Sequence, residues 1–274
     1  MVQSSLYFLQ RDPIYRAEKV YELRRSHDPK IPRTNMRLDK IEGIDIDDVR
    51  GQNCSLATNG FFLLNLGSTI TAEDFDDRSK VTQSFFPQLA GAVKSSLGAS
   101  RIQIFDYALR KRHHDFPISN GGVYEHKQPS CVAHVDSTTG DMERLRRELN
   151  LAEYQSLSKL RCQFLTAWMP LRGPARDWPL TLCDVQSVDP KTDLEPCDLV
   201  DPNEISETYS VHYTPRQRWC YLKDQMPGEV WVFLQADSNG AIGVPHASFQ
   251  HPEATEKDPL RESIEVRMLV FYED

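Results

Sequence analysis

A succession of short apolar segments separated by turns runs through the second part of the chain, and this pattern most constrains the fold. Segments of this length, rich in β-branched and aromatic residues, predict β-strands. They cover residues 102–107, 130–135, 162–171, 180–187, 208–213, 218–222, 229–234 and 263–272. About eight short strands are typical of a double-stranded β-helix, or jelly-roll barrel, in which alternate side chains surround a central pocket. We therefore expect a mainly β protein with flanking helices.

The first hundred residues follow other patterns. Residues 1–45 are charged and interrupted by prolines, which predicts an arm wrapped over a larger body. Strands are expected at residues 46–51 and 61–66, on either side of an asparagine-glycine turn. Apolar residues then recur at helical spacing over residues 71–97, which predicts supporting helices and hence a helical N-terminal part.

The length of 274 residues is ordinary for a single barrel domain. We expect residues 1–274 to form one domain, with an N-terminal arm and supporting helices in residues 1–100. Residues 101–274 would form the jelly-roll core. A charged helical insert is expected within that core at about residues 141–160, with its leucines as the buried stripe.

Composition excludes several classes of partner and location. The formal net charge of −8 at pH 7 argues against a nucleic-acid-binding surface, which is normally basic. No run approaches the roughly 18 apolar residues needed to cross a bilayer, so no membrane contact is expected. No basic start followed by an apolar run marks a signal peptide, and the six cysteines lack CxxC spacing. We therefore expect a cytoplasmic protein with reduced thiols; a homodimer is compatible with the sequence.

The triplet His134-Val135-Asp136 suggests a metal site. Residues i and i+2 of a strand point to the same side, so His134 and Asp136 can reach one ion. His246 is a candidate third ligand, although its apolar surroundings are also typical of a hydrogen-bonded core histidine. Two imidazoles and one carboxylate leave the other positions of a metal open, as in the facial triad of non-haem Fe(II) oxygenases.

The last predicted strand carries two arginines on one face. Arg261, Ser263, Glu265 and Arg267 alternate with apolar residues, so they share a side. An arginine is a fixed, always-charged partner for a carboxylate, which fits the need to hold a keto-acid co-substrate. The alternative is an edge strand on which Arg267 pairs with a neighbouring glutamate at the surface.

Several segments between about Ile44 and Tyr272 resemble a fungal hydroxylase/desaturase family of specialised metabolism. This family includes aspergillic-acid-type hydroxylases, gibberellin-desaturase-like proteins and a relative associated with cephamycin methoxylation. The segments that carry the resemblance are residues 47–51, 74–77, 105–110, 133–136, 177–184, 218–221, 245–246 and 261–267. The chain departs from the family at Tyr107, where histidine is usual, and at residues 166–170, where an asparagine-containing, tryptophan-arginine-proline run is more typical.

The resemblance implies an oxygenase that uses Fe(II), 2-oxoglutarate and molecular oxygen to hydroxylate or desaturate a small molecule. The implied iron ligands are His134, Asp136 and His246. The implied contacts to 2-oxoglutarate are Arg261, Ser263 and Arg267.

Aromatic residues near these segments are candidates for the lining of the substrate pocket: Phe105, Tyr107, Trp168 and Trp178. Two other interpretations stay open from the residues alone. One is a cupin-like metal enzyme that uses no keto-acid co-substrate. The other is a non-catalytic barrel that binds a ligand.

Overall fold

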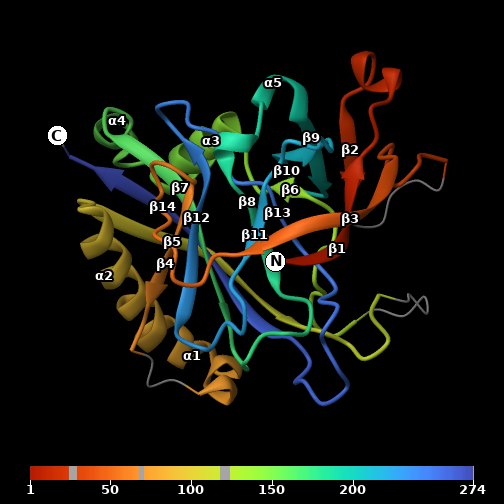
Figure 1. Cartoon of the computed structure of the whole chain (residues 1–274). Helices are drawn as coiled ribbons and strands as arrows, with labels where there is room; N and C mark the ends of the chain where they lie inside the picture. Colours follow the sequence, from red (N-terminus) through yellow and green to blue (C-terminus); the bar gives the residue numbers. More distant parts are fainter. Residues whose placement is uncertain (25–29, 68–70, 118–123, 274) are drawn as a thin grey trace.

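The computed structural model describes residues 1–24, 30–67, 71–117 and 124–273. It is mostly β, with two sheets and few helices (Figure 1). The strands are β1 (Val2–Leu9), β2 (Val20–Leu23), β3 (Leu38–Asp48), β4 (Phe61–Asn65), β5 (Arg101–Lys111), β6 (His134–Val135), β7 (Arg161–Pro170), β8 (Leu180–Cys183), β9 (Leu194–Asp201), β10 (Glu204–Val211), β11 (Trp219–Tyr221), β12 (Glu229–Asp237), β13 (His246–Ser248) and β14 (Glu262–Tyr272). The helices are η1 (Pro13–Arg16), η2 (Ala72–Asp76), α1 (Arg78–Lys80), η3 (Val81–Phe85), α2 (Phe86–Leu97), α3 (Thr139–Leu149), α4 (Tyr154–Leu157), η4 (Val185–Ser187) and α5 (Pro190–Asp193).

The two sheets pack against each other. The larger has the strand order β1-β3-β11-β8-β13-β6-β10-β9-β2, and the smaller has the order β4-β12-β7-β14-β5. Leu180 and Leu182 of the larger sheet share a hydrophobic cluster with Phe233 of the smaller one. The ring of Phe233 also lies 4.9 Å from that of His246 on β13. Side chains from strands far apart in sequence therefore meet between the sheets.

Helix α2 covers the outer face of the smaller sheet (Figure 1). Its Leu89 and Val93 are fully buried, so this face contributes to the core. Pro87 in the first turn is compatible with a helix start, since its missing N–H would have no partner there. Gly98 follows in the left-handed conformation, with φ of 63°, and ends the helix.

The N-terminal arm expected over residues 1–45 is wrong for the described residues, because β1, β2 and most of β3 lie in this region. β1 pairs antiparallel with β3, and β3 pairs parallel with β11, so the segment extends the larger sheet. Leu6 and Phe8 of β1 are buried at alternate positions, as are Ile44 and Ile46 of β3. The residues between these positions are Tyr7 in β1 and Asp45 in β3, and the period-two pattern was missed among the charged residues of the segment.

The helical insert expected at about residues 141–160 is two helices, α3 and α4. Asn150 ends α3, since its side chain donates a hydrogen bond of 3.0 Å to the carbonyl of Arg146. The break leaves Leu149 and Leu151 exposed, against the expected buried stripe, whereas Leu157 is buried.

Close packing at Gly243 yields a stability prediction. A Cβ added there would lie 2.2 Å from the carbonyl oxygen of Gln235 and 2.4 Å from a methyl group of Val135. We expect Gly243→Ala to cost about 1–3 kcal/mol, because backbone on one side and a buried side chain on the other must shift. Thermal unfolding followed by circular dichroism measures the effect.

The matched control is Gly91→Ala on α2, where an added Cβ meets nothing within 4 Å. It should leave the melting temperature unchanged or raise it, because alanine is the better helix former. A melting temperature of Gly243→Ala at or above that of the wild type would contradict the packing.

Candidate metal centre and its cavities

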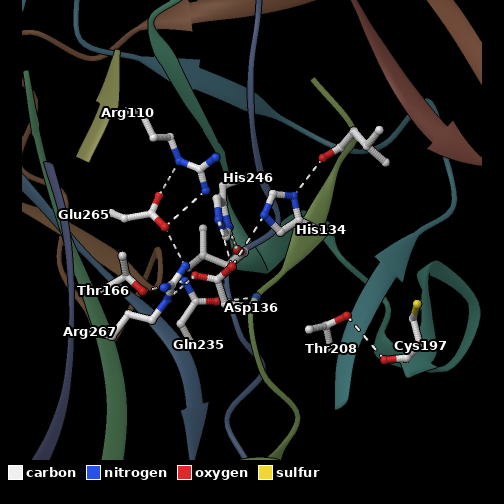
Figure 2. Close-up of polar contacts among 12 residues, drawn as sticks. Arg110, His134, Asp136, Thr166, Cys197, Thr208, Gln235, His246, Glu265 and Arg267 are labelled. Carbon is white, nitrogen blue, oxygen red and sulfur yellow. Dashed lines mark hydrogen bonds and ion pairs between the residues drawn. The ribbon is translucent and has the colours of Figure 1, made fainter. Parts of the chain in front are cut away.

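Two neighbouring strands bring His134 and His246 together. His134 on β6 lies directly opposite His246 on β13 in an antiparallel register, and their ring centroids are 4.3 Å apart. Asp136 follows immediately after β6 and points to the same side (Figure 2). The possible ligand atoms of these three residues all lie within 4.8 Å of one another. The sheet therefore gathers the three residues that the sequence analysis singled out.

The two imidazoles present the same nitrogen to the centre. His134 donates from Nδ1 to the carbonyl of Val132 at 2.7 Å, and His246 donates likewise to Val244 at 3.1 Å. Because a carbonyl only accepts, each Nδ1 carries a proton, and Nε2 is the ring nitrogen that can bind a metal. These Nε2 atoms lie 3.5 and 3.9 Å from the Oδ1 of Asp136.

The protonation states suit a divalent cation. Burial and the neighbouring His134 lower the pKa of His246 to about 4, so this imidazole is neutral at pH 7. Burial raises the pKa of Asp136, but Arg267 and the two imidazoles together hold it well below its usual value. A neutral His246, an ionised Asp136 and the Nε2 of His134 form a donor set that fits Fe(II), and their common side is open.

Asp136 is fixed by two residues from the smaller sheet. Its backbone N–H donates to Gln235 on β12 at 2.8 Å, and Gln235 in turn donates to Thr166 at 3.0 Å. Arg267 on β14 lies 3.5 Å from its Oδ2. Gln235 was not predicted from the sequence. A glutamine within the apolar run of β12 nevertheless indicates a buried side chain that needs a hydrogen-bonding partner.

Arg267 lies within a network of carboxylates rather than in an anion-binding pocket. It pairs with Asp106 at 2.7 Å and with Glu265 at 2.5 Å, in addition to Asp136. Glu265 also accepts two hydrogen bonds from Arg110, at 2.8 and 3.1 Å (Figure 2). Burial disfavours the charge of Arg267, yet the three carboxylates raise the pKa of Arg267 above its usual value. The expected role of Arg267 as a contact to 2-oxoglutarate is therefore disfavoured, since its charge is already compensated.

Arg261 has the opposite environment. Its side chain is buried, 5% exposed, and it donates to the carbonyl of Trp178 at 2.7 Å, to Ser263 at 3.2 Å and to Ser248. Its guanidinium lies over the Trp168 ring, 5.0 Å from the centroid. Within the described ranges it has no carboxylate at ion-pair distance. Burial, together with Arg110, lowers the pKa of Arg261 to about 9, and the carboxylates of Glu265 and Asp177 offset this lowering only in part.

Two cavities meet at the triad. The larger, about 720 Å³, is lined by His134 and Asp136 together with Phe105 and Phe164. A narrow second cavity is lined by the whole triad and by Arg261. His134 and Asp136 belong to both linings, so an ion held there would face both cavities.

Three of the aromatic candidates differ from the expected pocket lining. Tyr107 packs on Phe86 of α2, on the outer face of the smaller sheet, and lines neither cavity. The reason is a β-bulge: β14 pairs with Asp106 and then with Ile104, which leaves Phe105 as the extra residue. Phe105 and Asp106 consequently both line the larger cavity, although they are adjacent.

The two tryptophans lie near Arg261. Trp168 lines the narrow cavity only, beneath the guanidinium. Trp178 packs its ring on Phe116, 4.8 Å away, and contributes its backbone carbonyl. Neither lines the larger cavity.

A second group of possible metal ligands lies in the described part of the chain. His113, His114 and Asp115 also bring ligand atoms within 4.8 Å of one another. The group sits in a loop, and two of its three residues are exposed. It borders neither cavity, so it has no place for a substrate beside the ion.

The chain is similar to curated fungal proteins over most of its length. It is 30% identical to "Alpha-ketoglutarate-dependent dioxygenase phiK" of Fungal sp. (strain ATCC 74256), covering 85% of this chain and 84% of that protein. It is 29% identical to "Hydroxylase/desaturase efuI" of Hormonema carpetanum, covering 84% of this chain and 83% of that protein. The solved "iron and alpha-ketoglutarate-dependent endoperoxidase NvfI" superimposes with a TM-score of 0.85 at 26% identity, covering 99% of this chain and 98% of the other.

These relatives define the class: the protein is an Fe(II)- and 2-oxoglutarate-dependent dioxygenase. The chain belongs to the fungal dioxygenase and hydroxylase/desaturase family of specialised metabolism, and a family model described as "Oxidoreductase/YMDC permease-like domain" matches residues 6–271. The resemblance inferred from the sequence is confirmed, and a cupin without keto-acid co-substrate or a non-catalytic barrel is disfavoured. Among the described residues, no helix has the length and apolar character needed to cross a membrane.

The charge network predicts a pH dependence of stability. Burial raises the pKa of Glu265, but Arg110 and Arg267 outweigh it and lower the value from 4.5 to about 2. A folded-state pKa below the unfolded one contributes stability that is complete above the unfolded value and is lost as the pH falls towards the folded value. In Glu265→Gln, the urea midpoint should therefore fall less between about pH 5 and about pH 3 than in the wild type.

The control for this measurement is Glu256→Gln, at an exposed position outside both cavities. It should follow the wild-type pH dependence. Parallel curves for the wild type and Glu265→Gln would show that the network does not hold Glu265 ionised.

Proposed function

We propose that His134, Asp136 and His246 hold Fe(II), and that Arg261 with Ser263 holds the far carboxylate of 2-oxoglutarate. The observation that carries this proposal is the narrow cavity, which is lined by the triad and by the buried guanidinium of Arg261. Among the described residues this guanidinium has no ion-pair partner. A small molecule in the larger cavity would then lie beside the same ion.

The protein's residues orient both ligands. Arg261 is held over Trp168 by the carbonyl of Trp178 and two serine hydroxyls, so its remaining N–H groups are pre-set for an anion. The keto-acid end of the same molecule would then reach the open side of the triad. Burial strengthens this contact because little water competes for the charge.

Iron and 2-oxoglutarate together supply the oxidising chemistry. O₂ is consumed, 2-oxoglutarate is converted to succinate and CO₂, and two electrons are taken from the substrate. One oxygen atom enters succinate. The other enters the substrate as a hydroxyl group, or leaves as water when two hydrogens are removed.

Other residues orient Asp136 and shield the metal site from water. Gln235 holds the backbone of Asp136 and Arg267 contacts its Oδ2, so the other carboxylate oxygen faces the histidines. Phe105 and Phe164, with ring centroids 5.2 Å apart, form an apolar wall of the larger cavity and limit water near the reacting C–H bond. We propose hydroxylation or desaturation of a small specialised metabolite as the outcome.

The proposal also covers the barrel architecture, the number of domains, the location of the protein and its partners. We propose that the two facing sheets form a jelly-roll barrel and that residues 1–274 act as a single domain. The six cysteines are free, which supports a reducing, cytoplasmic location. We propose that the protein acts on a small molecule and binds no nucleic acid, and we retain the homodimer as a prediction for solution measurements.

Loss of the anion contact should separate co-substrate binding from metal binding. We expect Arg261→Met to weaken 2-oxoglutarate binding by about tenfold to a hundredfold, because a charge-assisted hydrogen-bonded contact is removed. Iron binding should persist. Titration of 2-oxoglutarate into the anaerobic Fe(II) protein, followed by the visible charge-transfer band, measures the change.

The matched control is Arg176→Met, which removes an arginine paired with Asp224 outside both cavities. It should bind 2-oxoglutarate as the wild type does. Equal affinity of Arg261→Met and the control would place the co-substrate elsewhere.

Removal of one of the three proposed metal ligands should strongly weaken Fe(II) binding. We expect His246→Ala to lower Fe(II) affinity strongly, because three ligands become two. Anaerobic equilibrium dialysis, with iron measured by elemental analysis, gives the stoichiometry and affinity. His114→Ala is the control, since it disrupts the exposed second group and should leave one bound iron. The reverse pattern would move the metal centre to the loop.

A further inference from the structure

The large cavity has a charged lining that is almost fully paired. Asp106 pairs with Arg267 at 2.7 Å. Asp141 and Glu204 both pair with Arg144 at 2.9 Å. The acidic side chains of this lining are thus neutralised by the protein itself and do not call for a cationic ligand.

Among the described residues, two cations of this lining, Arg24 and Lys127, have no ion-pair partner, and Lys127 is the one that interacts electrostatically with Arg267 and Glu265 beside the triad. Lys127 is therefore the cation of interest. It lines the large cavity, and in the part of the chain that the structure describes no carboxylate lies at ion-pair distance from its ammonium group. Burial lowers the pKa of Lys127, and Arg267 and Arg110 lower it further. Glu265 and Asp106 act in the opposite direction, but both are already paired with these arginines. Lys127 therefore offers positive charge to the cavity interior.

The position of Lys127 is fixed by its neighbours. Its backbone forms a bridge with Arg110 on β5, and Arg110 donates to the carbonyl of Gln128 at 2.7 Å. The Gln128 side chain accepts from the backbone of His113 at 2.7 Å and donates to the carbonyl of Lys111 at 3.0 Å. The segment that carries Lys127 is therefore tied to the end of β5, and Lys127, although exposed to solvent, lines the large cavity from this fixed position.

The rest of the lining is apolar or weakly polar. Phe105, Phe164 and Leu145 form one part of the wall. Thr208 and Ser210 of β10 line the same cavity, and Figure 2 shows the Thr208 hydroxyl donating to the carbonyl of Cys197. Such a lining fits an apolar skeleton with a few oxygen substituents.

We propose that the substrate is an organic anion, an apolar skeleton whose carboxylate or comparable oxyanion contacts Lys127 while its body lies along the apolar wall. This inference rests on the proposed function, which puts the oxidising centre at the triad. The anion in question is not the co-substrate, because Lys127 lines only the large cavity whereas Arg261 lines only the narrow one. Lys127 would then be a determinant of specificity.

The test uses two probes with the same aromatic skeleton: 1-anilinonaphthalene-8-sulfonate, which is an anion, and N-phenyl-1-naphthylamine, which is neutral. Fluorescence titrations are made on the protein loaded anaerobically with Fe(II) and 2-oxoglutarate. We expect the wild type to bind the anion more tightly than the neutral probe. Lys127→Met should weaken the anion about tenfold and leave the neutral probe within about twofold, since one charge-assisted contact is lost.

Two further variants complete the test. Lys127→Arg should retain the preference for the anion, because the charge is kept. Lys94→Met, at an exposed position on α2 outside both cavities, changes the net charge equally and should behave as the wild type. An unchanged affinity of Lys127→Met for the anion, or an equal loss for both probes, would overturn the inference.

The charge-transfer band of Fe(II) with 2-oxoglutarate separates this inference from the proposed function. If the band is present in the wild type and in Lys127→Met, only the substrate anion is being tested. If Lys127→Met loses the band, Lys127 serves the co-substrate and the inference is wrong while the proposed function stands. If the wild type gives no band, the proposed function fails and this inference fails with it.

Discussion

The cross-strand pair of His134 and His246 is the constraint on which the rest of the site depends. The two residues are far apart in sequence, and only the register of β6 against β13 puts their imidazoles side by side. A slip of one residue would turn either side chain to the opposite face of the sheet. Both cavities adjoin a metal site, and Arg261 lies beside one, only if this register is kept.

A second layer of charges adapts the buried centre to a metal ion. An isolated carboxylate would be costly between two sheets, and Arg267 reduces that cost for Asp136. Arg267 is balanced by Glu265, and Glu265 by Arg110, so alternating charges extend to the wall of both cavities. Such a chain keeps Asp136 ionised and oriented. Arg261 lines the narrow cavity and, among the described residues, has no ion-pair partner of its own.

Much of this arrangement was accessible from sequence, and the failures have physical causes. Period-two spacing placed His134 and Asp136 on one side and put Arg261 and Ser263 on one face of β14. Tyr107 was expected at the pocket because it lies in a segment of the family resemblance, but the bulge at Phe105 reverses the alternation, and no local signal marks that bulge. The charge pairing of Arg267 was not predicted, since its three carboxylate neighbours include Asp106 of β5 and Asp136 after β6. A pairing that depends on tertiary structure cannot be read from one strand.

The two cavities that meet at the triad are lined largely by different strands and helices. Apart from a small shared set at the triad, the narrow cavity is lined from β7, β8, β12, β13 and β14, whereas much of the large one comes from α3, β9 and β10. Mutations on α3, β9 and β10 leave the lining of the narrow cavity unchanged, although Phe164 of β7 and Arg267 of β14 also line the large one. A lineage with this architecture is therefore free to diversify what it oxidises while the oxidant itself is inherited intact.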